Sequence, residues 1–355
     1  MTRMTLPLPE PSQGADAYAR ERMACLALDF RKRENFVRYH ATPRRAATVD
    51  YLPIKLDIEN VSRCNFKCTM CAVAGWKKGK RAEDMSLECF KRLIDEQYGL
   101  VEIKLNGLGE ALMQGDDYYE MIKYARARRI WVRMTTNASL LGVNDNYKKL
   151  ADSGVNEIDI SIDGADAETF EAIRVGGSFK HVAANCMRLN DYLGEPRSKM
   201  WTLVQARNAH NLKEHVRLAA HLGFKHLVFS LSLHGWGDDA LADKNDKASF
   251  ELTDYELREL IDLGTVHKVR VAFWDVADKF TQDKPCPWPF ERAVVTSDSR
   301  VTPCCMIGNP DAMEISGGKS FSEVWFGAQY TEFRQAHLGG KIPALCRGCY
   351  KANGA

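Results

Sequence analysis

Three cysteines within eight residues constrain this chain more than any other stretch. Cys64, Cys68 and Cys71 have the spacing C-x3-C-x2-C, which can bring three thiolates onto one face of a tight loop. No fourth cysteine lies nearby, because Cys89 falls in a helical pattern. Three protein thiolates on a four-iron cluster would leave one iron open to a substrate. Zinc and a disulfide are the alternatives, but structural zinc takes four ligands, and a disulfide suits secreted chains and would leave one thiol over.

The position of these cysteines adds to the pattern, because they follow a strand-like stretch at residues 54–59. A C-x3-C-x2-C motif directly after such a stretch resembles the radical S-adenosylmethionine (SAM) superfamily. The resemblance implies a 4Fe–4S cluster whose open iron is chelated by the amino and carboxylate groups of SAM. One electron from that cluster would cleave SAM to methionine and a 5′-deoxyadenosyl radical.

Composition excludes several other classes of protein. The chain has 355 residues, 45% hydrophobic and 27% charged, as is ordinary for a soluble globular protein. Its net charge of +2 indicates neither nucleic acid nor an anionic membrane surface as a partner. There is no apolar run long enough for a transmembrane helix and no secretory signal. Eleven cysteines without a signal indicate metal and redox chemistry in a reducing compartment, so we expect a cytoplasmic protein.

Strand-like and helical stretches alternate from residue 52 to about residue 235. This alternation predicts an α/β fold, a parallel sheet with helices outside, and six units fit a partial (β/α)6 barrel, the fold that the resemblance implies. Ligands in such sheets bind at the carboxyl ends of the strands. We expect strands at residues 54–58, 100–105, 130–135, 157–162, 201–204 and 226–231, and helices at 86–97, 116–128, 145–152, 166–174, 179–192 and 211–222. A further strand-like run at residues 269–274 is expected to end the barrel domain.

We expect the chain to divide into three parts. Residues 1–50 form an N-terminal helical leader, with a helical pattern over residues 15–40. Residues 51–275 form the barrel, and residues 276–355 form a small C-terminal extension.

Two elements after the second and third strands resemble SAM-binding elements of the family. Asn106–Gly107–Leu108–Gly109–Glu110 is similar to its "GGE" element, so the resemblance implies that Gly109 and Glu110 bind the amino group of SAM. A G-x-G-E run by itself reads equally well as a tight turn. Asn137 lies in a T-N-G-type turn with alanine in place of glycine, and it is expected to line the pocket or to cap a helix.

Ser161 and Arg174 follow the fourth strand. The run Ser161–Ile162–Asp163–Gly164 is similar to the family's S-[IL]-D-G element, which implies that Ser161 reaches the ribose of SAM. Asp163 has an alternative as a helix cap at Ala165. Arg174 either clamps a carboxylate of SAM or substrate, or is a solvated helix end. Six polar or aromatic residues after the fifth and sixth strands are expected to line the same pocket: Arg207, Asn208, His210, His234, Trp236 and Asp238.

A second group of cysteines occupies the C-terminal part. Two strand-like runs at 293–296 and 301–303 flank a turn and predict a β-hairpin, and residues 321–337 are helical. Cys286, one of the Cys304–Cys305 pair, Cys346 and Cys349 make a set of four thiolates that could hold zinc or a second 4Fe–4S cluster. Beside the first motif, the arrangement resembles the shortened "twitch" form of the SPASM extension, which implies one auxiliary cluster, for electron transfer or as a structural clip.

The two adjacent cysteines cannot share one role, because neighbouring residues of an extended segment point to opposite sides. We assign Cys304 to the auxiliary cluster, since it follows the hairpin strand where the family's extension places a ligand. Cys305 is then a free thiol. It is either a small buried residue or the catalytic donor of a hydrogen atom to a substrate radical.

The resemblance implies that the deoxyadenosyl radical removes a hydrogen atom from a C–H carbon inside the barrel. Because residues 1–50 leave no room for a leader-binding domain, we expect a small sugar or aminocyclitol-like substrate that is epimerised or oxidised. A maturase of ribosomal peptides is the alternative, and a non-catalytic iron–sulfur protein is the alternative of another class. An external one-electron reductant of the flavodoxin or ferredoxin type is also implied.

Overall fold

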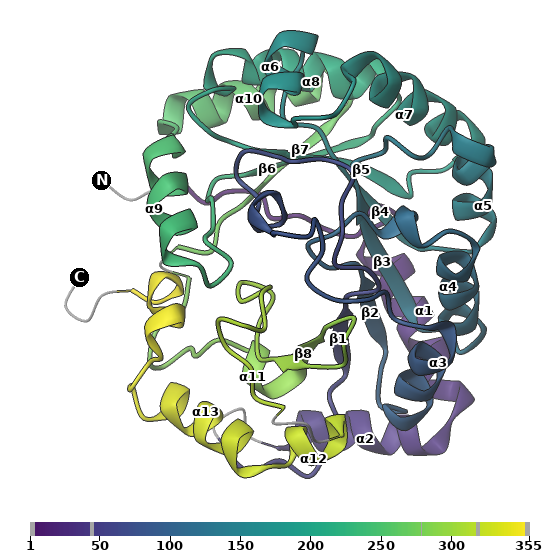
Figure 1. The fold of residues 1–355 in the computed structure, drawn as a ribbon, viewed down its shortest axis with the longest axis vertical. Helices are drawn as coiled ribbons and strands as arrows, with labels where there is room; N and C mark the ends of the chain where they lie inside the picture. Colours follow the sequence, from purple (N-terminus) through teal and green to yellow (C-terminus); the bar gives the residue numbers. More distant parts are fainter. Residues whose placement is uncertain (1–3, 43–45, 278, 317–319, 352–355) are drawn as a thin grey trace.

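In a computed structural model, the described residues 4–42, 46–277, 279–316 and 320–351 form a mixed α/β fold around one nine-stranded sheet (Figure 1). The strand order is β7-β6-β5-β4-β3-β2-β1-β8-β9, and every neighbouring pair is parallel except β8 and β9. The strands are β1 (Lys55–Ile58), β2 (Glu102–Leu105), β3 (Trp131–Thr136), β4 (Glu157–Ser161), β5 (Ser198–Leu203), β6 (His226–Ser230), β7 (Arg270–Trp274), β8 (Arg292–Val295) and β9 (Val301–Thr302).

Helices lie on the outer side of the curved sheet, as the alternating pattern predicts (Figure 1). Gly154 and Gly223 follow helices with φ of +80° and +86°, the left-handed conformation expected of C-terminal caps. The helices are α1 (Ala15–Leu28), α2 (Phe30–Ala41), α3 (Leu87–Glu96), α4 (Asp116–Ala127), α5 (Asn146–Asp152), α6 (Ala167–Ile173), α7 (Phe179–Leu193), α8 (Leu212–His221), α9 (Asp239–Ala248), α10 (Asp254–His267), α11 (Trp288–Glu291), α12 (Phe321–Trp325) and α13 (Ala328–Leu338), and the short 3₁₀ helices are η1 (Ala72–Gly75), η2 (Ala111–Gln114), η3 (Val143–Asp145), η4 (Ala209–Asn211) and η5 (Ala344–Cys349).

The two faces of the sheet differ in chemistry because successive side chains of a strand point to opposite sides. Leu56 and Ile103 belong to the buried apolar core. On the other face, Glu102 forms ion pairs with Arg292 at 3.4 Å and with Lys55 and Arg133 at 3.8 Å. The inner face of the barrel therefore carries a buried network of charges.

The amino ends of β2 and β3 are covered by α1. The hydroxyl of Tyr18 donates to Glu102 at 2.7 Å, and its ring packs edge-on against Trp131 with the centroids 5.1 Å apart. The predicted helix over residues 15–40 is two helices, because Asp29 ends α1 in an extended conformation and caps α2. With the amino ends covered, the carboxyl ends remain for a ligand.

The sheet is wider than the six predicted βα units, and β7 matches the further strand expected at residues 269–274. β7 continues it beyond β6, and the predicted hairpin of β8 and β9 joins it at the other edge, where Lys55 of β1 pairs with Arg292 of β8. This pairing satisfies the edge of β1, which would otherwise expose unpaired backbone groups. The C-terminal cysteines are thereby attached directly to the strand that precedes Cys64. No helix in the described ranges has the length and apolar character needed to span a membrane.

Candidate functional site

The three-cysteine loop directly follows β1 and is held in place by the segment after α6. The backbone N–H of Lys67 donates to the carbonyl of Val175 at 2.8 Å, and that of Thr69 donates to Ile173 at 3.0 Å. Lys244 and Asn245 of α9 donate to the carbonyls of Thr69 and Met70 at 2.6 and 3.1 Å. The loop is therefore fixed from two sides before any ligand binds.

The donor set of this loop fits an iron–sulfur cluster. Burial raises the pKa of Cys64 to about 12 and that of Cys71 to about 11, so these thiols require a bound cation to lose their protons. The N–H of Phe66 donates to the Cys64 sulfur at 3.4 Å, and a guanidinium N–H of Arg174 lies 4.0 Å from the Cys68 sulfur. A structural zinc site takes four ligands, whereas this loop offers three cysteines, so the donor set favours a cluster over a zinc ion.

Glu110 lies beside this loop and is buried. Its N–H donates to the carbonyl of Arg63 at 2.9 Å, and a Cβ on Gly109 would come within 2.5 Å of that same carbonyl oxygen. Only glycine therefore lets the two loops approach so closely. The carboxylate accepts hydrogen bonds from Thr136 Oγ1 at 2.7 Å and from the N–H of Asn137 at 2.8 Å. Burial nevertheless raises its pKa, so a cationic partner would stabilise the ionised form.

Asn137 connects the Glu110 region to the cysteine loop. Its side-chain amide donates to Asn65 Oδ1 at 3.0 Å and lies 3.9 Å from the Cys64 sulfur. Ala138 has φ of +60°, the conformation for which the family's glycine is suited. No helix begins at this turn, and the Asn137 side chain instead accepts from the N–H of Ser139 at 3.0 Å, so the helix-cap alternative is wrong.

Asp163 and Arg174 form a buried ion pair at 2.7 Å, with side chains 0% and 10% exposed. The helix-cap alternative for Asp163 is wrong, because Asp166 caps α6 and Asp163 accepts instead from the N–H of Leu203 at 2.8 Å. The solvated-helix-end alternative for Arg174 is wrong, because its side chain is buried and paired with Asp163. Ser161 is half-buried at the carboxyl end of β4, and its hydroxyl makes no hydrogen bond with the described residues.

The residues after β5 and β6 are less uniform than predicted. Asn208 is buried and donates to the carbonyls of Asp163 and Leu203 at 3.0 and 2.8 Å, which is a structural role. Arg207 and His210 are exposed, and Asp238 caps α9 through the N–H of Leu241 at 2.9 Å. His234 and Trp236 are half-buried and pack edge-on, with centroids 5.8 Å apart.

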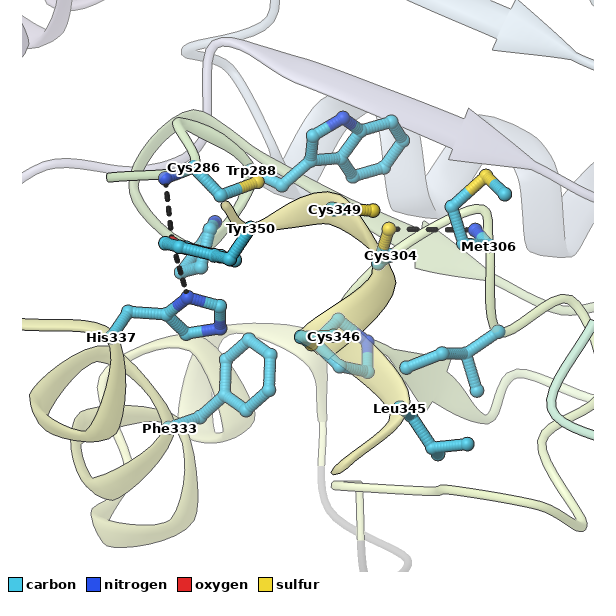
Figure 2. A pocket seen from close by; sticks show the side chains of 13 residues that line it. Cys286, Trp288, Cys304, Met306, Phe333, His337, Leu345, Cys346, Cys349 and Tyr350 are labelled. Atoms are coloured by element: carbon cyan, nitrogen blue, oxygen red, sulfur yellow. Dashed lines mark hydrogen bonds between the residues drawn. The ribbon is translucent and has the colours of Figure 1, made fainter. Parts of the chain in front are cut away.

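The C-terminal cysteines meet in a second pocket with an apolar lining (Figure 2). Cys286, Cys304, Cys346 and Cys349 all line it, although 63 positions separate Cys286 from Cys349. Burial raises the pKa of Cys286 and of Cys346 to about 12. The N–H of Met306 donates to the Cys304 sulfur at 3.4 Å, as Phe66 does to Cys64. Four thiols of this kind fit a cluster that is ligated by protein on every iron.

Cys305 does not line this pocket. A hydrogen bond from the Cys304 thiol lowers its pKa against the effect of burial, and the charges of Asp57, Lys104 and Arg292 also act on it. These three charged residues come from β1, β2 and β8, and alternation puts Lys104 on the same inner face of the sheet as Glu102. Cys305 therefore lies near charged residues of the sheet, and it is also close enough to Cys286 and Cys349 to raise the pKa of both.

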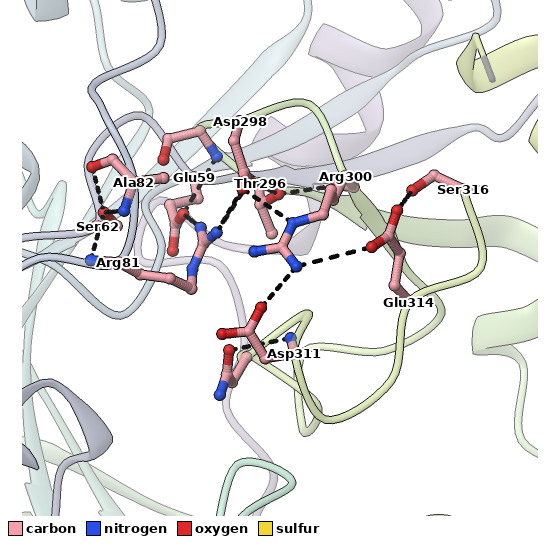
Figure 3. A network of polar contacts seen from close by, with 12 residues as sticks. Glu59, Ser62, Arg81, Ala82, Thr296, Asp298, Arg300, Asp311, Glu314 and Ser316 are labelled. Atoms are coloured by element: carbon pink, nitrogen blue, oxygen red, sulfur yellow. Dashed lines mark hydrogen bonds and ion pairs between the residues drawn. The ribbon is translucent and has the colours of Figure 1, made fainter. Parts of the chain in front are cut away.

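A chain of charges joins the two cysteine regions (Figure 3). Arg81, on the segment after the first cysteines, pairs with buried Glu59 at the end of β1 and makes two bonds of 2.9 Å to Asp298 in the β8–β9 turn. Arg300 continues the chain to Asp311 at 2.6 Å. Sequence reasoning missed this chain, because Arg81 and Asp298 lie 217 positions apart and neither belongs to a motif. It also missed Asn65, although its place inside the cysteine motif marked it for inspection.

Comparison with known families identifies the class. The model of the radical SAM superfamily matches residues 61–219, and that of the SPASM iron–sulfur cluster-binding domain matches residues 286–350. The chain therefore has a radical SAM domain followed by a C-terminal SPASM domain. This confirms the resemblance and the fold class. The first domain implies a 4Fe–4S cluster and SAM, and the second implies auxiliary iron–sulfur clusters.

Individual relatives are more distant. The chain is 30% identical over 205 residues to the mycofactocin maturase MftC of Mycolicibacterium smegmatis, which covers 58% of this chain and 51% of that protein. It therefore spans about half the length of the curated relatives of this kind. It is 22% identical over 305 residues to a protein of Pyrococcus furiosus that modifies the cofactor of tungsten-containing aldehyde ferredoxin oxidoreductase, covering 79% and 82% of the two chains. Streptococcus suis SuiB, solved with its precursor peptide SuiA, has the same fold, with a TM-score of 0.64, 14% identity and coverage of 89% and 73%.

Proposed function

We propose that this chain is a radical SAM maturase that removes a hydrogen atom from a carbon of a peptide substrate. The observation that carries the proposal is the meeting of three thiols, one buried and two half-buried, with a buried carboxylate, Glu110, at the carboxyl ends of β1 to β3. When bound there, the reduced cluster and SAM supply a 5′-deoxyadenosyl radical that removes hydrogen atoms from C–H bonds. An external one-electron donor supplies the electron.

Each residue of the site has a part in this proposal. Cys64, Cys68 and Cys71 hold the cluster, and the ionised Glu110 accepts the ammonium group of SAM. Asn137 fixes the cysteine loop against Glu110. Gly109 allows the loop of Glu110 to approach the cysteine loop closely. Ser161 offers its hydroxyl to the ribose of SAM. Arg174, which is paired with Asp163, stabilises the Cys68 thiolate.

A peptide is favoured over the sugar or aminocyclitol that the chain length suggested. The relatives include a mycofactocin maturase, and a neighbour of the same fold was solved with a precursor peptide. Their names support the peptide alternative better than epimerisation or oxidation of a sugar. The test of the substrate class below therefore includes carbohydrate-like compounds as the alternative.

Cys286, Cys304, Cys346 and Cys349 are proposed as ligands of an auxiliary 4Fe–4S cluster. Cys305 is proposed to face the substrate, since it does not line the pocket of the other four cysteines and the charges of Asp57, Lys104 and Arg292 on the sheet act on it. If it donates a hydrogen atom, Cys305→Ala should keep both clusters and 5′-deoxyadenosine formation but lose the inverted product. Loss of auxiliary iron in that variant would mean that Cys305, and not Cys304, is the cluster ligand. Normal product formation would refute the donor role.

The test of the proposed function is anaerobic reconstitution followed by reduction with dithionite. The protein should bind about eight irons in two 4Fe–4S clusters and release 5′-deoxyadenosine from SAM. The joint replacement of Cys64, Cys68 and Cys71 by alanine should leave about four irons and abolish SAM cleavage. SAM cleavage by this triple variant would refute the proposal.

The substrate class is tested by mass spectrometry with two panels of compounds. One contains short precursor peptides encoded beside this gene, and the other contains sugars and aminoglycosides. A change of mass in a peptide, with 5′-deoxyadenosine formed in proportion, supports the maturase. A change confined to the second panel would overturn the peptide assignment and leave the radical chemistry intact.

A further inference from the structure

His337 lies at the end of α13 and lines the four-cysteine pocket, but no cysteine spacing points to it. Its side chain is 2% exposed, and its Nε2 atom has no hydrogen-bond partner among the described residues. A buried polar atom without a partner costs free energy, so such an atom needs an explanation. Its position on the wall of a cysteine pocket makes it a candidate for a function there.

The hydrogen bonds of Tyr350 favour one assignment of the proton on His337. The backbone N–H of Cys286 donates to the Tyr350 hydroxyl at 2.8 Å, and the same hydroxyl lies 2.8 Å from His337 Nδ1 (Figure 2). An N–H group can only donate, so the tyrosine oxygen accepts from Cys286. We assign the hydroxyl proton, which that bond leaves unused, to the hydrogen bond with Nδ1. His337 Nδ1 is then an acceptor, and the proton of the neutral imidazole resides on Nε2.

The unpartnered group is therefore a donor, and it faces a pocket in which the available acceptors are sulfur atoms. In Figure 2 the second nitrogen of His337 points away from Tyr350, toward the side on which Cys346 is drawn. Phe333 packs edge-on against the imidazole, with the centroids 4.7 Å apart, and helps to fix the orientation of the ring.

We propose that His337 is a positioning residue that donates a hydrogen bond from Nε2 to a sulfur of the auxiliary iron–sulfur cluster, in a tautomer held by Tyr350. The inference rests on the proposed function in one respect, the auxiliary cluster in the four-cysteine pocket. A hydrogen bond to a cluster sulfur stabilises the reduced, more negative form and so raises the reduction potential. Tyr350 follows the proposed ligand Cys349, and its hydroxyl contacts both the backbone N–H of the proposed ligand Cys286 and His337. The orientation of His337 is therefore coupled to the two segments that carry these cysteines.

The test is a redox titration of the auxiliary cluster followed by electron paramagnetic resonance. It uses the full chain with Cys64, Cys68 and Cys71 replaced by alanine, so that the auxiliary cluster is the only one present. In this background His337→Phe, which keeps a ring but loses the N–H, should raise the ratio of oxidised to reduced cluster at a fixed potential by roughly tenfold. For a one-electron couple this is a fall of about 59 mV in midpoint potential.

Three further variants separate a hydrogen bond from packing. His337→Gln retains an N–H donor and should stay near the parent potential. Tyr350→Phe removes the hydroxyl that holds the proton of His337 on Nε2, so either tautomer can form and the shift in potential should be intermediate. His215→Phe is the matched control, since it removes an equally buried imidazole with an unpartnered Nε2 from α8, away from the pocket. It should leave the potential unchanged. If the His337→Phe protein does not bind iron, the midpoint potentials of His337→Gln and Tyr350→Phe are compared instead.

Magnetic resonance gives a second readout. The hydrogen-bonded proton should exchange in D2O and give a deuterium coupling to the reduced cluster that His337→Phe abolishes. Equal potentials in the parent and in all His337 and Tyr350 variants would overturn the inference, and so would the strong nitrogen coupling of a directly ligated imidazole. If the triple-alanine variant binds no cluster, the assignment of an auxiliary cluster to the four cysteines is wrong. That result would contradict the proposed function and can be distinguished from a failure of the His337 inference alone.

Discussion

Replacing Arg81 tests whether the charged chain of Figure 3 attaches the C-terminal extension to the barrel. The two ends of the Arg81 contact differ in burial. The side chains of Arg81 and Glu59 are 4% and 2% exposed, whereas that of Asp298 is 32% exposed. Arg81→Met would leave Glu59 as a buried carboxylate with no cation, which costs about 3–5 kcal/mol. Asp298→Asn removes a partner that water can replace, which costs about 0.2–1 kcal/mol.

The assay is thermal unfolding of the reconstituted protein with iron counted before and after. For a chain of this length 1 kcal/mol corresponds to about 1.3 °C, so Arg81→Met should lower Tm by about 4–7 °C and Asp298→Asn by about 1 °C or less. The double variant Arg81→Met/Glu59→Gln should recover much of the loss, because it removes the stranded charge. Burial already raises the pKa of Glu59, and losing Arg81 raises it further. The penalty should therefore shrink as the pH falls and Glu59 takes up a proton, and grow as the pH rises.

The reasoning would be refuted by equal, small losses of stability in Arg81→Met and Asp298→Asn, since these would mean that water reaches Glu59. It would also be refuted by a penalty for Arg81→Met that is larger at acidic pH. A loss of auxiliary iron confined to Arg81→Met would agree with the attachment of the extension through this residue.

Three further predictions concern the barrel. Glu110→Gln should weaken SAM binding at least about tenfold while the iron content stays unchanged, because the ammonium group loses its charged partner; unchanged affinity by equilibrium dialysis would reduce Glu110 to a structural cap. Asp163→Asn should destabilise the protein by about 3–5 kcal/mol by stranding the buried Arg174, as urea unfolding would show. Burial acts to raise the pKa of Glu102, but Lys55, Arg292 and Arg133 together lower it from 4.5 to about 2. Its ionised form therefore contributes about 3 kcal/mol above pH 4.5 that is lost as the pH falls toward 2, and Glu102→Gln should flatten this acid limb of the stability curve.

Local spacing was sufficient to predict much of the site. Cys64, Cys68 and Cys71 lie within eight residues of one another, so their spacing alone brings the sulfurs close together. The alternation of apolar and polar stretches predicted β1 to β6 and their helices, because parallel strands require helical crossovers on the outside. The order of these units then brought Glu110 and Asn137 to the same edge as the cysteines.

Tertiary structure alone decided the contacts that tie the regions together. β8 pairs with β1 because the sheet leaves one edge open, and nothing local in either strand specifies that partner. The pairing of Arg81 with Asp298 and the hydrogen bond from Cys286 to Tyr350 join residues 217 and 64 positions apart. The ion pair of Arg174 with Asp163 spans only 11 positions, but its burial depends on the packing around it. Sequence reasoning could assign charges and ring types to these residues but not their partners, because partners far apart in the chain meet only when the sheet and its helices have packed.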